Sequence, residues 1–279
     1  MRLARVTRNG KIGLAAKSGN AVTMAFGADV ADLDAHIAAG TLAEAGAKAA
    51  AGEAVDEATL NFLPPITKPS KIICLGLNYR DHAEESGLGI PEFPVLFARF
   101  PSSLTGHGAP VILPKVSSQL DWEAELVVVL SKGGKNIGEA DALNHVAGYS
   151  VFNDASIRDY QLRTPQWTAG KNFDDTGAFG PYLVTPEELP AGAAGLKIEC
   201  RVNGQIMQSS NTGKLIFTVA NTIHLLSTFM TLEAGDMLVM GTPGGVGVAR
   251  DPQVWMKAGD VCEVEIEGVG LLSNPIVAE

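Results

Sequence analysis

Residues 119–130 read QLDWEAELVVVL, and the two halves of this stretch have opposite character. The second half, residues 127–130, is an apolar run typical of a strand buried on both faces. The first half places Asp121, Glu123 and Glu125 at every second position. Because side chains alternate between the two faces of a strand, these three carboxylates would project the same way. A strand that enters a core with three like charges on one side requires an explanation.

Two explanations are open for the Glu123 and Glu125 pair. At about 4 Å, two unit charges repel by about 1 kcal/mol even in bulk water, and by more at a lower effective dielectric. A bound divalent cation would remove this repulsion, and so would exposure of the strand end to solvent. Oxygen-only ligands favour a hard ion such as Mg²⁺, Mn²⁺ or Ca²⁺ over zinc.

The bulk composition narrows the classes of partner. The chain has 279 residues and a formal net charge of −10, which argues against nucleic-acid and anionic-membrane partners but not against a small anionic substrate. Cys74, Cys200 and Cys262 are widely spaced and form no CxxC pattern, so a disulfide framework or zinc site is not expected. We find neither a signal peptide nor a run of about 20 apolar residues. These features predict a soluble cytoplasmic protein.

The sequence divides near residue 68. Residues 1–68 combine a hairpin pattern that turns at Asn9-Gly10 with an alanine-rich helical stretch and a proline-rich connector, which predicts a small N-terminal α+β domain. Residues 69–279 contain several strand-like runs and one long helical pattern at 213–230. This arrangement predicts a β-rich α+β domain rather than a regular series of βαβ units.

Four further polar positions could belong to the same site. Asp154 ends an aromatic and β-branched run at 148–153, where it could cap a following helix or aim its carboxylate at a shared ion. Arg158 and Gln161 are spaced so that they share a helical face with Asp154. Lys171 lies in a glycine-rich polar loop, either as a surface residue or as part of a site.

Two other segments carry candidate residues. In CLGLNYRDHAEESG (74–87), His82 and Glu85 are spaced i, i+3, so the carboxylate could orient the imidazole as a general base acting on water. The alternative is the exposed, charged first turn of a helix. MGTPGGVG (240–247) lacks the Lys-Ser/Thr ending of a phosphate-binding loop. We interpret it as a tight turn between strands, with Thr242 as a candidate substrate contact.

Taken together, these segments resemble the fumarylacetoacetate hydrolase family. The resemblance covers roughly residues 69 to 275 and rests on KIICLGLNYRDHAEESG, PVLFARFPSSLTG, DWEAELVVVL, GYSVFNDASIRDYQ, TAGKNF and GDMLVMGTPGGVG in that order. It implies the family's β-rich catalytic domain, a mixed β-sandwich roll, and a homodimer. It leaves Asp121 outside the ligand set. The roles that it implies are metal ligation by Glu123, Glu125 and Asp154, catalysis by His82, Glu85 and Lys171, and substrate contacts by Arg99, Arg158, Gln161 and Thr242.

The resemblance also implies an activity. We expect a hydrolase, dependent on Mg²⁺ or Mn²⁺, with Ca²⁺ as a further option, that cleaves a C–C bond in a 2,4-diketo acid such as an acylpyruvate and releases pyruvate or a related 2-oxo acid. The alternatives are decarboxylation of a β-keto acid such as oxaloacetate and isomerisation of an unsaturated oxo-dioic acid, both through an enolate. A non-catalytic protein with a structural ion would leave Lys171 and the His82–Glu85 spacing without a role.

Overall fold

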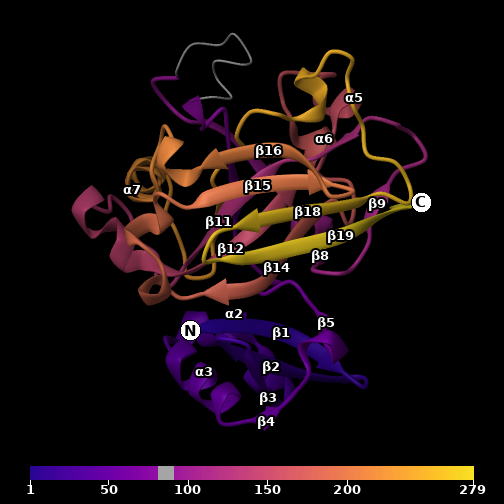
Figure 1. Ribbon diagram of the computed structural model, residues 1–279. Helices are drawn as coiled ribbons and strands as arrows, with labels where there is room; N and C mark the ends of the chain where they lie inside the picture. Colours follow the sequence, from indigo (N-terminus) through magenta and orange to yellow (C-terminus); the bar gives the residue numbers. More distant parts are fainter. Residues whose placement is uncertain (81–90) are drawn as a thin grey trace.

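The computed structural model describes residues 1–80 and 91–279, and strands dominate these two ranges (Figure 1). The strands form a twelve-stranded sheet, a five-stranded sheet and a two-stranded ladder. The strand-rich α+β class predicted from the sequence is confirmed. Among the described residues, no helix has both the length and the apolar character that a membrane crossing requires.

The large sheet contains the site. Its strand order is β4-β3-β2-β1-β14-β12-β11-β17-β6-β7, with β5 paired to β1 and β8 paired to β14. Neighbouring strands are antiparallel, except for the parallel pairs β17–β6 and β14–β8. The bounds are β1 Arg2–Arg8, β2 Lys11–Ser18, β3 Ala21–Phe26, β4 Glu53–Ala54, β5 Asn61–Phe62, β6 Ile72–Gly76, β7 Val95–Arg99, β8 Leu104–Gly106, β11 Ala124–Leu130, β12 Val146–Asp154, β14 Gly177–Val184 and β17 Met237–Val239.

The remaining strands and the helices lie outside this sheet. The five-stranded sheet runs β16 Gln205–Asn211, β15 Lys197–Val202, β18 Val261–Ile266, β19 Gly270–Ala278 and β9 Val111–Leu113, and the ladder pairs β10 Leu120–Asp121 with β13 Ser156–Ile157. The α-helices within residues 1–80 and 91–279 are α1 Ala28–Ala31, α2 Leu33–Ala39, α3 Leu42–Ala50, α5 Arg158–Gln161, α6 Thr168–Lys171 and α7 Val219–Phe229. The short 3₁₀ helices are η1 Glu57–Thr59, η2 Pro101–Ser103, η3 Glu139–His145, η4 Pro186–Glu188, η5 Ala191–Ala193, η6 Thr212–Lys214 and η7 Gly247–Ala249.

The N-terminal segment forms the hairpin and helices that its sequence indicates. The β1–β2 hairpin turns at Asn9 (φ 50°) and Gly10 (φ 75°), both in the left-handed region that a two-residue hairpin turn requires. Strand β1 also pairs with β14, with Arg2 opposite Val184, so the hairpin continues the large sheet. The domain boundary near residue 68 stays a prediction, and the large sheet runs across it.

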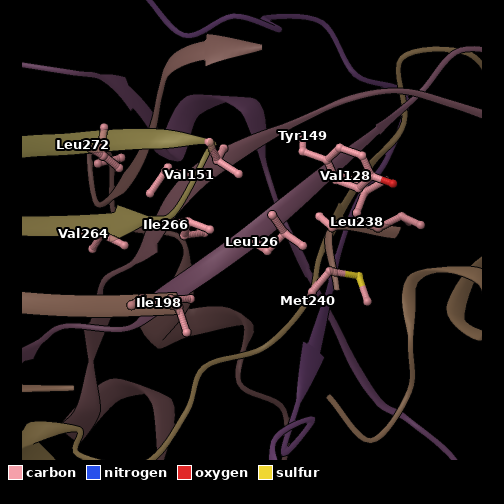
Figure 2. Packing of buried hydrophobic residues seen from close by; sticks show 14 of the residues in the cluster. Leu126, Val128, Tyr149, Val151, Ile198, Leu238, Met240, Val264, Ile266 and Leu272 are labelled. Carbon is pink, nitrogen blue, oxygen red and sulfur yellow. The ribbon is translucent and has the colours of Figure 1, made fainter. Parts of the chain in front are cut away.

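Both faces of β11 are buried, which explains its apolar run. On one face, Leu126 and Val128 point toward the small sheet, which contributes Val264 and Ile266 (Figure 2). On the other face, Val127 and Val129 belong to a second buried cluster that includes Leu3, Leu14, Leu33 and Ile37 of the N-terminal segment. The strand therefore has apolar neighbours on each side, as a fully buried strand requires.

Candidate active site

Strand pairing brings the predicted metal ligands together at one end of β11 and β12. The register places Ala124 opposite Asn153, and the backbone N–H of Asp154 donates to the carbonyl of Glu123 at 3.0 Å. As a result, one carboxylate oxygen each from Glu123, Glu125 and Asp154 lies within 4.8 Å of the others. All three residues are buried. The solvent-exposed alternative for this strand end is therefore wrong.

The donor set fits a hard divalent cation. Burial raises the pKa of Glu125 well above its usual range, and the charges of Asp154 and Glu123 raise it further. Burial also raises the pKa of Asp154, although the cations of Lys171 and Arg99 oppose this shift. A divalent ion would relieve the repulsion among three buried carboxylates, and oxygen ligands suit Mg²⁺, Mn²⁺ or Ca²⁺.

Lys171 is buried in this cluster, so the surface interpretation is wrong. It ends the short helix α6, and its side chain is 1% exposed. Its Nζ donates at 2.7 Å to Glu123 Oε2 and at 2.7 Å to Asp154 Oδ2. Burial alone would lower the pKa of Lys171, but the carboxylates of Asp154 and Glu123 outweigh that effect and raise it. The ammonium group is therefore held as a cation beside two of the three candidate ligands.

Arg158 and Asp121 form an ion pair next to the candidate ligand Glu123. Arg158 lies in α5, where Ile157 rather than Asp154 occupies the N-cap position. Its Nε donates to Asp121 Oδ2 at 2.8 Å, while its Nη1 lies 2.7 Å from Glu123 Oε1 and donates to Gln161 Oε1 at 2.8 Å.

Asp121 is not one of the three clustered ligand residues. Its carboxylate accepts from the backbone N–H groups of Gly247 at 2.7 Å and Val248 at 2.9 Å, in addition to Arg158. The third carboxylate of the opening stretch therefore positions Arg158 and fixes a loop.

Arg99 lies behind Asp154 rather than at the cavity surface. Its side chain is 0% exposed, its Nη1 lies 3.0 Å from Asp154 Oδ1, and its Nη2 donates to Thr176 Oγ1 at 2.8 Å. Arg99 is not among the residues that line the cavity. This corrects the expected contact with a substrate carboxylate, because the guanidinium instead balances the charge of a buried aspartate.

The segment at 240–247 is not the tight turn between strands that we expected. After β17 ends at Val239, the chain forms no strand until β18 begins at Val261. The backbone N–H of Gly241 donates to Glu125 Oε2, and Thr242 Oγ1 donates to the carbonyl of Ala124 at 3.0 Å. The backbone N–H groups of this loop donate hydrogen bonds to the carboxylates of the site. In a turn between two paired strands, these groups would instead donate to the neighbouring strand.

A cavity of about 190 Å³ opens beside the three carboxylates. Among the described residues, its polar lining consists of Glu123, Glu125, Arg158, Gln161, Lys171 and Thr242. The remainder is apolar or glycine and consists of Leu75, Gly76, Leu77, Phe97, Leu162, Trp167, Val246, Val248 and Ala249. We did not predict this apolar wall, although Trp167 stands in the same short segment as Lys171. His82 and Glu85 lie outside the described residues.

The fold and this site define a class of protein in which three buried carboxylates cluster at the end of two paired strands, next to a cavity. The model of the family described as "Fumarylacetoacetate (FAA) hydrolase C-terminal" matches residues 71–277. The chain therefore belongs to the fumarylacetoacetate hydrolase family, which is an enzyme superfamily.

Relatives and solved structures agree with this placement. The chain is 45% identical over 225 residues to "Oxaloacetate tautomerase fahd2, mitochondrial" of Xenopus laevis, covering 80% of this chain and 70% of that protein. It is 44% identical over 220 residues to the human "Oxaloacetate tautomerase FAHD2A, mitochondrial", covering 78% and 70%.

Two solved structures cover the whole chain. A fumarylacetoacetate hydrolase from psychrophilic Exiguobacterium antarcticum has a TM-score of 0.89 at 32% identity, with 100% of both chains covered. A 5-carboxymethyl-2-hydroxymuconate delta-isomerase from Mycobacterium smegmatis has a TM-score of 0.80 at 29% identity, covering 100% of this chain and 99% of that one.

Proposed function

We propose that this protein is a divalent-metal-dependent enzyme that interconverts the keto and enol forms of a small 2-oxo acid. The observation that carries this proposal is the Lys171 ammonium, which lies 2.7 Å from both Glu123 and Asp154 at the edge of the cavity. Proton transfer next to a 2-oxo group places negative charge on the carbonyl oxygen, and a fixed positive charge at that point is commonly the largest catalytic contribution. The names of the two tautomerase relatives support this reaction class.

The protein's own groups have separate tasks. Glu123, Glu125 and Asp154 would hold the ion, which when bound supplies Lewis-acid polarisation of the 2-oxo acid. Lys171 stabilises the charge that develops on the oxygen at C2. Arg158 and Gln161, fixed to each other at 2.8 Å, bind and orient the substrate carboxylate. The group that accepts the proton from C3 is proposed to be His82, oriented by Glu85; both lie outside the described residues.

Hydrolysis of a 2,4-diketo acid is the second candidate. It needs water to attack the carbonyl at C4 and therefore depends on a water-activating base, for which His82 is the candidate. The similarity to the Exiguobacterium antarcticum hydrolase structure favours this reaction. Decarboxylation of oxaloacetate would use the same charge stabilisation. Release of CO₂ distinguishes it experimentally from tautomerisation and from hydrolysis.

Two further properties are part of the proposal. We propose a homodimer, which sedimentation of the purified protein would test. We also retain the cytoplasmic location from the sequence, which localisation of the tagged full chain would test, since two of the relatives are named as mitochondrial.

The test is a parallel assay of the purified protein with Mg²⁺, Mn²⁺ or EDTA. Enol-oxaloacetate is followed by ultraviolet absorbance for ketonisation and by CO₂ release, and acetylpyruvate is followed for pyruvate release. We expect metal-dependent ketonisation, and a loss of more than about 100-fold in activity and in Mg²⁺ affinity for Glu125→Gln.

The matched control is Glu265→Gln on the small sheet. Its carboxylate is 49% exposed, pairs with Arg201 and does not line the cavity. It should retain both activity and Mg²⁺ affinity. Full ketonisation in EDTA would refute the metal-dependent proposal, and pyruvate release without ketonisation would move the assignment to the hydrolase.

A further inference from the structure

We propose that the substrate carries one uncharged, apolar group beyond its 2-oxo acid, and that this group binds against the indole of Trp167. The inference rests on the proposed function and names the substrate class of that same cavity. Dicarboxylic 2-oxo acids, including oxaloacetate, would then be the weaker ligands. Two independent observations support it: the construction of the apolar wall and the balance of charge in the site.

The indole is held in place by two strands of the large sheet. Trp167 packs edge-on against Phe97 of β7, with ring centroids 5.5 Å apart. At the end of β6, a Cβ atom at Gly76 would lie 2.3 Å from Cζ3 of Trp167 and 2.7 Å from Cη2. The absence of a side chain at Gly76 therefore allows the indole to rest on the strand. Sites built on strands are positioned more rigidly than sites built on loops.

The wall continues around Trp167 with further apolar side chains. Val246 and Val248 line the cavity from the loop after β17, and Leu162 lines it from the end of α5. Leu162 is 66% exposed, so most of this large apolar side chain is not covered by the protein. A ligand with an apolar group would bury this surface, whereas an ionised group would lose water there without a partner.

The charges of the described part of the site match one substrate carboxylate. Among the described residues, the three cations near the ligand cluster are ion-paired to carboxylates, and four carboxylates against three cations leave one negative charge. A divalent ion changes this balance to one positive charge. The groups counted are the carboxylates of Asp121, Glu123, Glu125 and Asp154 and the cations of Arg99, Arg158 and Lys171.

The part of the cavity lining that the structure describes offers no further lysine or arginine to a second substrate carboxylate. Within the described residues, the cavity lining contains no lysine or arginine besides Lys171 and Arg158. The sequence of residues 81–90, DHAEESGLGI, also contains neither. The far end of a dicarboxylate would therefore meet the apolar wall without a lysine or arginine as counter-ion.

The test compares two unreactive ligands of equal shape, N-isobutyloxamate and N-oxalylglycine, by calorimetry on the Mg²⁺-saturated protein. Both carry the chelating oxalyl group, but the first ends in an isopropyl group and the second in a carboxylate. We expect the isobutyl compound to bind at least about tenfold tighter, the size of effect that burial of two methyl groups supports. Trp167→Ala and Gly76→Ala should each weaken the isobutyl compound about tenfold and leave N-oxalylglycine within about twofold.

The control is Trp255→Ala, which removes a tryptophan that does not line the cavity and should leave the preference unchanged. Equal or tighter binding of N-oxalylglycine would overturn the inference and leave the proposed function standing. Equal weakening of both ligands by Trp167→Ala would overturn it as well, because the indole would then be only structural. Binding of neither ligand would refute the proposed function together with this inference.

Discussion

The two ends of β11 are equally buried and yet are stabilised in different ways. At one end, Glu125 is 1% exposed and lies among other carboxylates. At the other end, Val128 is 0% exposed and packs between Tyr149 and Leu238 on the neighbouring strands (Figure 2). Burial therefore does not by itself make a strand apolar, provided that other segments supply charges of the opposite sign.

The two ends of β11 differ in how strongly the stabilising contribution of each residue depends on its neighbours. Apolar burial at Val128 is proportional to the area removed from water, so it depends little on any single neighbour. The carboxylates at the other end depend on Arg99, Arg158 and Lys171, which come from three separate segments. Removing one member of such a network leaves the others buried without a partner. We therefore expect strong coupling at the charged end and near-additive effects at the apolar end.

The largest expected effect is at Lys171. In EDTA, Lys171→Met should lower the free energy of unfolding by about 3–5 kcal/mol, because Glu123 and Asp154 lose their shared buried donor. Urea denaturation measures the change. Mg²⁺ should restore part of the loss, since a divalent ion replaces the missing positive charge. The control is Lys257→Met on the surface, and a loss below about 1 kcal/mol for Lys171→Met would contradict the description of the network.

An intermediate effect is expected at the apolar end. Val128→Ala should cost about 2 kcal/mol of unfolding free energy, from the lost transfer of two methyl groups and a small cavity between the sheets. The same denaturation experiment measures it, with Val277→Ala at a 43% exposed position as the control. The cost should be the same in EDTA and in Mg²⁺. A cost that changes with Mg²⁺ would show that the two ends of β11 are not independent.

The smallest expected effect lies away from both ends, at His107. Its imidazole packs edge-on against Phe62, with ring centroids 5.2 Å apart, and its Nδ1 accepts from the backbone N–H of Ser273 at 3.1 Å. Burial lowers the pKa of His107, and Glu57 opposes the shift. The unfolded chain therefore binds a proton more readily than the folded protein. As a result, stability is full above about pH 6.5 and falls as the pH drops toward the folded-state pKa.

His107→Gln should remove this part of the pH dependence, by less than about 1 kcal/mol between about pH 7.5 and 5.5. Urea midpoints at the two pH values, compared with His145→Gln, measure the difference. An unchanged slope in His107→Gln would place the titrating group elsewhere.

Local patterns in the sequence were sufficient for much of the fold. Asn9-Gly10 predicts the hairpin because few residues adopt a left-handed backbone, and the structure has positive φ at both positions. The helical pattern at 213–230 contains α7, which begins only at Val219, and the apolar run after Glu125 corresponds to a strand buried on both faces. The clustering of Glu123, Glu125 and Asp154 was also predicted. Strand alternation placed the two glutamates on one face, and the resemblance to the family added Asp154.

The sequence by itself determined which residues alternate or turn, since these properties depend on neighbours a few positions away. Only the tertiary structure decided which charges neutralise one another: that Arg99 lies behind Asp154, that Asp121 holds Arg158, and that Lys171 is buried. It also decided that the bare backbone at Gly76 supports the indole of Trp167. These contacts join segments tens of residues apart, and ion pairing and packing depend on distances in space that no local pattern encodes.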